Sequence, residues 1–347
     1  MKNKQLGFTI VELMVGLLLS LLLVGGVLQV YFGTKATYKI TEGLSRLQEN
    51  TRFSVDTLAR DIRMAGYVPC SQPQDKFNVV NAGVNDWWAK IFDNRIKGFE
   101  SGVSTFPVGL DAAPGTDAIL ILRGGEKVAG VNFFDSTNNR FVMQRDLNQG
   151  WLTNNKYDGS LMIACDSTKA TLFQAKTVNT KTIEVATSGI TPGNSSVVTQ
   201  SYGNDSQLTN YKAVIYYISD SVSGDGLSLF RKYLNVASAG SRVSDREELI
   251  EGVENMQLLY GIDAKSDADS FANRYIQANE VTDWLDVVSV KIGLLMASEN
   301  GLRGSGGDDL DTYIVANTSI GVNGDITHPQ DQRKRYVSEM IVSLRNI

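Results

Sequence analysis

One acidic residue lies where an acid is costly, inside an apolar stretch near the amino end of the chain. From Phe8 to Phe32 the sequence is apolar enough to cross a bilayer, yet Glu12 places a carboxylate within it. A charged side chain costs roughly 2.5 to 3.5 kcal/mol at the centre of a membrane helix, so such an acid usually has a partner and a function. The uncut chain offers Glu12 no charged partner. A cut before Phe8, four residues away on the same helix face, would create an amine that can pair with Glu12 in the same chain or in a neighbouring subunit.

Few other residues offer catalytic chemistry. The single histidine, His328, precedes Pro329 in a polar stretch, and we expect a solvated side chain there rather than a catalytic one. Histidine triads and multi-histidine zinc sites are hard to build with one histidine, and no G-x-S-x-G motif occurs. The glycines of "GGEK" at 124–127 lack the phosphate-loop framework and predict a turn. We therefore expect no enzyme activity, no cofactor and no metal site, with a membrane-anchored periplasmic hydrolase as a remote alternative.

The two cysteines, Cys70 and Cys165, are too far apart in sequence for a C-x-x-C metal motif. If the apolar segment exports the remainder of the chain, these thiols lie in an oxidising compartment, where a disulfide is the default expectation. Two unpaired buried thiols are the alternative, because sequence spacing does not establish proximity.

Three polar or aromatic patches have a simple and a sharper interpretation. The acidic loops at 219–226 and 306–311 cluster oxygen ligands that could hold Ca²⁺, but neither matches an EF-hand, and solvated loops are the commoner outcome. The tryptophan pair in "NDWWAKIF" at 85–92 could form a binding platform for a sugar or a partner. Packing under a loop is the expected role.

Charge and composition exclude some classes of protein. The 347-residue chain carries a formal net charge of −5 and has 42% hydrophobic residues. An acidic chain without a basic cluster argues against nucleic-acid binding, and the hydrophobic content is enough for a substantial core.

The apolar segment continues into a long amphipathic helix. Lys2 and Lys4 precede it as in a secretory signal, but the run is about 25 residues long and no A-x-A-like cleavage site comes after it. Beyond it, apolar residues recur at steps of three and four, which places on one helix face Ile40, Leu44, Leu47, Thr51, Val55, Leu58, Ile62 and Ala65. The other faces carry the charged residues Glu42, Arg46, Glu49, Arg52, Asp56, Arg60, Asp61 and Arg63.

We therefore expect a membrane-spanning half at 8–32 and an amphipathic half at 33–66, stopped by Gly66 and Pro69, in a rod of roughly 80 to 90 Å. Lys35 and Lys39 partly offset the basic start, so charge alone does not fix the orientation. A disulfide favours the carboxyl side outside.

The rest of the chain, 67–347, alternates short apolar runs with turn residues. Strands are predicted at 117–125, 182–189, 211–219, 227–234, 253–263, 285–298 and 335–346, the third and fourth forming a hairpin. The stretch 299–335 is rich in Gly, Asp and Asn and predicts a long exposed connection. One long helix ahead of a series of strands predicts an α+β fold with the helix packed on antiparallel sheets.

The start of the chain resembles a known processing signal. "GFTIVELMVGLLLSLLL" at 7–23 looks like the class III signal of type IV pilins and pseudopilins: a glycine, an aromatic residue, an acid four positions on, and a long apolar run. The resemblance implies a leader at 1–7, cleavage between Gly7 and Phe8 by a prepilin peptidase, methylation of the Phe8 amine, and a role for Glu12 in subunit assembly. Leu6 and Ile10 depart from the residues usual at those positions.

A second resemblance covers both ends of the folded part. "LARDIRMAGYVPC" at 58–70, "ELIEGVENMQLLYGID" at 248–263, "WLDVVSVKIGLL" at 284–295 and "VSLRN" at 342–346 together look like the PilW family of minor pilins, relatives of the J-type minor pseudopilin of type II secretion. Residues 71–200 are not covered. The family implies a pilin-like fold and a single pass through the inner membrane with a periplasmic domain. It also implies contacts with other minor and major pilins and with the inner-membrane assembly platform, and a place in a priming or tip complex of the pilus. The J-type pseudopilin is the alternative.

Overall fold

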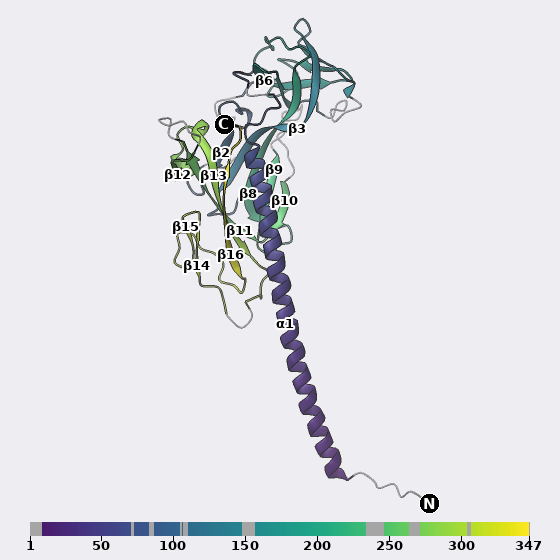
Figure 1. Ribbon diagram of the computed structural model, residues 1–347, viewed down its shortest axis with the longest axis vertical. Coiled ribbons are helices and arrows are strands. Elements are labelled where there is room, and N and C mark those ends of the chain that lie inside the picture. Colours follow the sequence, from purple (N-terminus) through teal and green to yellow (C-terminus); the bar gives the residue numbers. More distant parts are fainter. Residues whose placement is uncertain are drawn as a thin grey trace, which may run out of the picture.

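A 54-residue helix, α1 (Ile10–Arg63), begins the folded chain and runs from an isolated amino end into the body of the molecule (Figure 1). The computed structural model describes residues 9–70, 73–82, 87–104, 106, 110–147, 157–233, 246–263, 271–303 and 307–346. At 1.5 Å per residue, α1 is about 81 Å long. It ends close to the predicted stop, where Gly66 has φ +72° and donates its N–H to the Leu122 carbonyl at 2.8 Å. A left-handed residue after the last turn is the usual way to end a helix.

The remaining described elements are mostly strands. They are β1 (Asp75–Asn78), β2 (Ile96–Phe99), β3 (Ala118–Asp135), β4 (Arg140–Met143), β5 (Leu161–Cys165), β6 (Lys169–Val178), β7 (Thr182–Val185), β8 (Gln207–Asp220), β9 (Leu227–Tyr233), β10 (Arg246–Glu251), β11 (Val253–Ile262), β12 (Arg274–Ile276), β13 (Val287–Ala297), β14 (Thr312–Val315), β15 (Thr318–Gly321) and β16 (Arg335–Ser343). Short 3₁₀ turns lie at Trp87–Ala89, Ala278–Glu280 and Trp284–Asp286. Strands pair antiparallel apart from β1, which lies parallel to β6. The predicted α+β fold with antiparallel sheets is confirmed.

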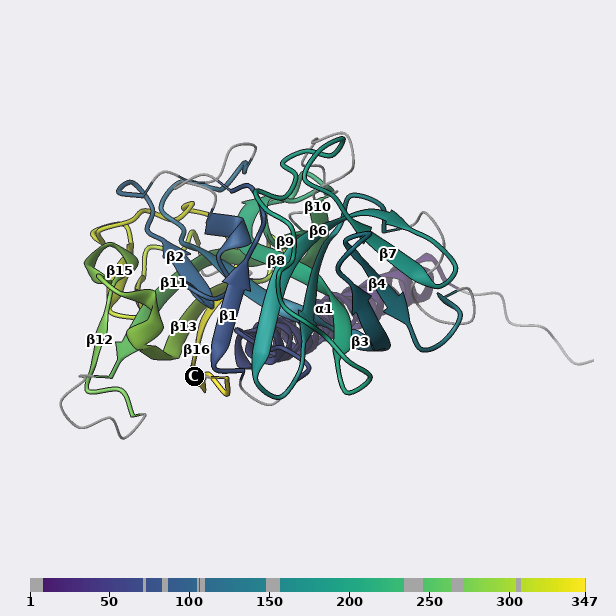
Figure 2. The ribbon, with the colours of Figure 1, turned by 90° about the horizontal axis from the view of Figure 1, so that it is seen from above.

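Part of the largest sheet closes on itself. Its strands lie in the order β10-β9-β8-β5-β6-β7-β4-β3-β2, and β3 also pairs with β8. The six strands from β8 through β3 therefore form a closed barrel, which removes their free edges. Its interior is filled by apolar and aromatic side chains, with Phe141 stacked on Phe173 at 4.9 Å between ring centroids and Tyr202 at 5.6 Å. Strands β3 and β6 of the barrel lie toward the end of the molecule opposite the start of α1 (Figure 1), and Figure 2 shows the molecule from that end.

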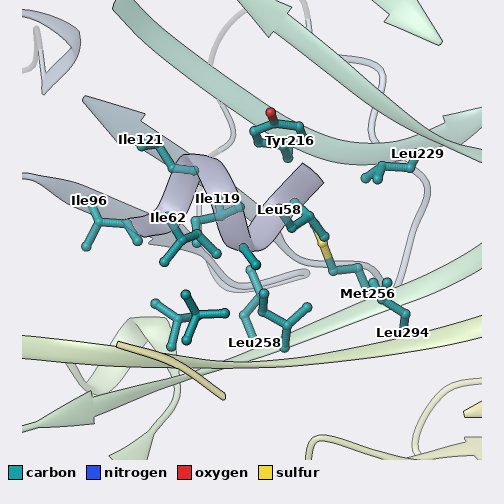
Figure 3. Packing of buried hydrophobic residues seen from close by; sticks show 14 of the residues in the cluster. Leu58, Ile62, Ile96, Ile119, Ile121, Tyr216, Leu229, Met256, Leu258 and Leu294 are labelled. Atoms are coloured by element: carbon teal, nitrogen blue, oxygen red, sulfur yellow. The ribbon is translucent and has the colours of Figure 1, made fainter. Parts of the chain in front are cut away.

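The carboxyl half of α1 packs between two sheets. On one side lie β3 and β8 of the large sheet, and on the other lies a four-stranded sheet in the order β12-β11-β13-β16. Leu58 and Ile62 of the helix are fully buried, between Ile119 and Tyr216 of the first sheet and Leu258 of the second (Figure 3). The predicted apolar face is confirmed in its later part, where Leu47, Leu58, Ile62 and Ala65 are buried, whereas Leu44 is 37% exposed.

One charged residue on α1 is buried as well, contrary to its predicted place on a polar face. Asp61 Oδ1 accepts a hydrogen bond from Arg123 of β3 at 3.1 Å, and Oδ2 accepts one from the Tyr216 hydroxyl of β8 at 2.7 Å. The side chains of Asp61 and Arg123 are 7% and 3% exposed. Burial and the Asp61 charge raise the pKa of Tyr216 well above its usual value, so the phenol stays protonated and donates. Helical periodicity could not reveal this, because Arg123 is distant in sequence.

Two predictions about loops are wrong. The glycines at 124–127 lie inside β3, where the register against β8 shifts between Gly124 and Val128, so they form a bulge in a strand rather than a turn. The stretch 299–335 is not simply an exposed connection, because it contains the hairpin β14-β15, and Leu302 and Asp309 in it are buried. The Leu302 side chain packs against Gly43 of α1. A Cβ at position 43 would lie 2.4 Å from the Leu302 Cδ2 atom.

The strands with long apolar runs were predicted at or near their observed places, as β3, β7, β8, β9, β11, β13 and β16, and the β8-β9 hairpin is confirmed. Short or mixed strands were not predicted, which applies to β1, β2, β4, β5, β6, β10, β12, β14 and β15. Most of these pair with a strand that is adjacent in sequence, as in β3-β4, β5-β6 and β14-β15, so it is their short length and mixed composition that gave no clear signal.

The buried ion pair yields a stability prediction. We expect Asp61→Asn to lower the free energy of unfolding by about 3 to 5 kcal/mol, because it removes the buried counter-charge of Arg123 and leaves only the half-exposed Glu126 at 3.9 Å. Asp56→Asn is the matched control: this helix carboxylate is 72% exposed and 3.7 Å from Arg52, and its loss should cost about 0.5 kcal/mol or less. Urea unfolding of the full chain in detergent micelles measures both. Equal effects of the two substitutions would contradict the role given to Asp61.

Candidate functional site

The amino end of α1 is built around Glu12. Thr9 is the N-cap, and its hydroxyl accepts a hydrogen bond from the Glu12 N–H at 3.3 Å. In return, Glu12 Oε2 accepts from the Thr9 N–H at 3.2 Å and from the Thr9 hydroxyl at 3.1 Å. This reciprocal arrangement is a capping box, in which two backbone donors at the helix start are satisfied by side chains. Gly7 and Phe8, the predicted cleavage residues, lie outside the described residues.

The sequence suggested that Glu12 is unpaired in the uncut chain. The capping box shows that it has hydrogen-bond partners there. It has neutral hydrogen-bond donors from Thr9 although it lacks a charged partner among the described residues. The signal was present as the pattern T-x-x-E in "TIVE" at 9–12, which is typical of a capping box. Both Thr9 hydrogen bonds end on Oε2, so Oε1 keeps its capacity to accept from an amine.

The helix surface beyond the capping box is apolar and free of the folded body. The large apolar side chains between Ile10 and Phe32 are 47 to 80% exposed. Among the described helices, α1 is long and apolar enough to cross a membrane. An exposed apolar surface of this extent indicates contact with lipid or with other apolar helices.

The two cysteines form a disulfide, as predicted. Cys70 comes shortly after α1 and Cys165 ends β5, and their Cα atoms are 5.9 Å apart. The bond joins the segment leaving the helix to a strand of the barrel. The disulfide therefore links the carboxyl end of α1 to the barrel.

In the acidic loops considered for calcium, aspartate side chains pair with arginines. In the loop at 306–311, the Asp309 side chain is fully buried and accepts from Arg335 at 3.0 Å, and it also pairs with Arg303. Burial alone would raise the pKa of Asp309, but hydrogen bonds from Arg335 and its other partners outweigh burial and lower it. In the loop at 219–226, Asp225 pairs with Arg333. Among the described residues, no group of three or more His, Cys, Asp or Glu has an arrangement suited to a metal ion.

Comparison with known families matches the two ends of the chain. Residues 215–346 match the family model described as Type IV Pilus-assembly protein W, and residues 2–28 match the Prokaryotic N-terminal methylation motif. The chain carries a PilW-family region behind a pilin-type methylation motif. The two matches are consistent with a type IV pilus minor pilin, and the amino-terminal motif supports membrane anchoring and association with pili. A search of curated proteins and a search of solved structures returned no match.

The PilW region, residues 215–346, contains the end of β8 and every later strand. It therefore includes the four-stranded sheet and the hairpin β14-β15. The strands β3 to β7 lie between the two matched ranges and supply most of the barrel. The segment "LARDIRMAGYVPC" at 58–70, which also carried the resemblance, lies between them too.

A buried ionic network holds the PilW region together. Arg335, whose side chain is fully buried, donates to Glu254 of β11 at 2.6 and 2.9 Å and pairs with Asp331 at 2.9 Å as well as with Asp309. Desolvation would lower the pKa of Arg335, but Glu254 and the other carboxylates raise it above its usual value. The network fixes both ends of the 299–335 segment to the sheet, which explains why Asp309 is buried instead of solvated.

The exposed fractions of His328 and Trp88 test two further predictions. His328 is 7% exposed rather than solvated, with Nδ1 2.9 Å from the Pro329 carbonyl and Nε2 2.9 Å from the Asp311 carbonyl. Trp88 is 2% exposed and packs in the core, as the simpler interpretation predicted. The side chain of Trp87 lies outside the described residues.

The disulfide gives a second prediction. The double variant Cys70→Ser, Cys165→Ser should lose on the order of 4 to 5 kcal/mol of unfolding free energy, because the bond closes a loop with a sequence separation of 95. Urea unfolding in detergent measures this loss. Reductant should destabilise the wild type and leave the double variant unchanged. Identical unfolding of reduced and oxidised wild type would contradict a stabilising role.

Proposed function

We propose that this chain is a minor pilin that takes part in initiating the assembly of type IV pili, in a priming or tip complex. The observation that carries the proposal is the combination of a methylation motif at the free end of a long exposed helix with a PilW region in the folded head. The folded part at 67–347, the head, leaves the apolar half of the helix uncovered. That half is available to pack with helices of other pilins, and the head is available to bind specific partners.

The proposed order of events starts in the inner membrane. Residues 1–7 form the leader, 8–32 span the membrane once, 33–66 form the amphipathic half of the helix, and 67–347 lie in the periplasm. The disulfide supports this orientation, because such bonds persist in oxidising compartments. A prepilin peptidase cuts between Gly7 and Phe8 and methylates the new amine. The assembly platform then brings the subunit to other minor and major pilins, and it reaches the cell surface at the pilus tip.

Glu12 would act at the assembly step. After cleavage, Thr9 becomes the second residue of the mature chain, so the capping box can persist. The amine of Phe8, or that of a neighbouring subunit, can then reach Oε1, which Thr9 leaves available. A charged amine is the stronger partner, because it adds the attraction between two opposite charges to its hydrogen bond with the carboxylate.

The Glu12 proposal separates pairing from capping. We expect Glu12→Ala to be cleaved normally but to impair pilus assembly, because the amine loses its carboxylate. Thr9→Val, the control, removes the side-chain cap but keeps the acid and should leave assembly largely intact. Gly7→Glu should block cleavage. Mass spectrometry of the mature amino terminus measures processing, and electron microscopy counts pili. Wild-type piliation by Glu12→Ala, or equal defects in Glu12→Ala and Thr9→Val, would contradict the pairing role.

The alternative, a J-type minor pseudopilin of type II secretion, gives a different phenotype. Deletion of the gene in its native host should abolish or sharply reduce surface pili and leave secreted enzyme activity at wild-type levels. Immunogold labelling of an epitope-tagged chain should mark filament ends. Normal piliation with lost secretion would instead favour the pseudopilin, and label along the whole filament would contradict the tip assignment.

A further inference from the structure

A small pocket lies where the carboxyl end of α1, the start of β2 and the end of the chain meet. Its volume is about 280 Å³, just below the usual range of ligand pockets, roughly 300 to 1,000 Å³. It is lined by Gly66, Val68, Cys70, Pro73, Gln74, Lys76, Ile91, Phe92, Arg95 and Asn346. The site lies at the end of α1 opposite the membrane segment, outside the amino-terminal machinery discussed above.

The charge of this pocket has one sign. Two lining residues, Arg95 and Lys76, are cationic, and none of the lining residues is acidic. Val68, Ile91 and Phe92 supply an apolar wall beside the two cations. Apolar walls with a few convergent polar groups are the usual composition of a binding site.

Arg95 is held in place, and one of its donor nitrogens has no acceptor. Its carbonyl accepts from the Leu122 N–H at 2.9 Å, and its Cγ and Cδ lie beneath Gly66, where a Cβ would come within 2.8 Å of either atom. One guanidinium nitrogen, Nη1, is buried and has no hydrogen-bond partner in the described chain. Burial lowers the pKa of Arg95, and the charge of Asp283, outside the pocket lining, opposes this. A buried donor without an acceptor is costly, so this arginine is prepared for an acceptor that the described residues do not supply.

The neighbouring helix end does not fill this role. Carbonyls at the carboxyl end of a helix often accept hydrogen bonds from a nearby arginine. Here the Arg63 and Ala65 carbonyls accept instead from Asn346 Nδ2, at 3.4 and 3.1 Å. Asn346 thus occupies the helix end and forms part of the pocket wall, and Arg95 remains available.

We propose that this pocket binds a carboxylate carried beside an apolar side chain on a segment of another polypeptide, with Arg95 as the main anion ligand and Lys76 at the rim. A guanidinium matches a carboxylate in geometry and can donate two parallel hydrogen bonds to it. The apolar wall accepts the neighbouring side chain. The carboxylate comes from an acidic side chain or from a chain end, which the test distinguishes.

Three N-acetylated tripeptides serve as probes. Ac-Ala-Glu-Leu-NH₂ carries a side-chain carboxylate, Ac-Ala-Gln-Leu-OH carries a terminal one, and Ac-Ala-Gln-Leu-NH₂ carries none. Thermal unfolding of the full chain in detergent micelles is monitored as each peptide is added at neutral pH. We expect at least one acidic peptide to raise Tm by about 2 to 4 °C at saturation and the neutral peptide to leave it unchanged. The acidic peptide with the larger effect identifies the source of the carboxylate.

The variants test the residues. Arg95→Gln should weaken the effective acidic peptide about tenfold or more, Lys76→Gln should weaken it less, and Arg95→Lys should recover part of the binding. Lys127→Gln, which removes an exposed cation outside the pocket, should bind as the wild type does. Lys76 is exposed, so its variant remains informative if Arg95→Gln is unstable. Equal shifts by the neutral peptide, an equal shift by inorganic phosphate, or undiminished binding by both pocket variants would overturn the proposal. The experiment needs no pilus, so it is independent of the proposed function.

Discussion

The buried pair between Asp61 and Arg123 is the interaction on which the arrangement of this molecule depends. It places a helix carboxylate against a strand of the large sheet, and the Tyr216 hydroxyl fixes the second oxygen. Because both charges are removed from water, the pair tolerates little displacement, whereas the apolar contacts of Leu58 and Ile62 can accommodate more than one packing. We therefore expect the ion pair to specify the rotation and height of α1 between the sheets. The end of the helix, the pocket beside it and the disulfide take their positions from that choice.

A second buried network of ion pairs fixes the arrangement of the PilW region, as the Asp61–Arg123 pair does for the helix. Arg335 joins β16 to Glu254 of β11 and to two acids of the 299–335 segment, and the neighbouring Arg333 reaches Asp225 in the loop between β8 and β9. The four-stranded sheet is thus connected through charged side chains to its own long segment and to the large sheet. Asp309, which looked like exposed loop chemistry in the sequence, is therefore structural.

The sequence predicted what depends on local pattern. The steps of three and four from Leu47 to Ala65 gave the buried face of α1, and unbroken apolar runs such as "AILIL" gave the central strands. The acid in an apolar helix start gave Glu12 as a candidate residue. Prediction failed where partners distant in sequence decide the outcome. Asp61 looked like a surface acid because Arg123 is far along the chain, His328 and Asp309 looked solvated because their loop is folded onto a sheet, and the barrel was missed because closure by β3 and β8 leaves no periodic signal. The capping role of Thr9 was local and could have been predicted from "TIVE".

The way α1 joins the head has a mechanical consequence. The helix is exposed from Ile10 until it meets Leu302 at Gly43, so tension between the apolar end and the head must pass through the stretch from Gly43 to Ala65. That stretch would be loaded in shear, along the helix axis, and it is held by the Gly43 contact, the Asp61 pair and the hydrogen bonds of Asn346 at its far end. Just past it, the bond from Cys70 to Cys165 provides a covalent route for force into β5. β5 is a strand of the closed barrel and is hydrogen-bonded to a neighbouring strand on both edges. A force on the helix is therefore distributed over the barrel strands, and no single strand can separate alone.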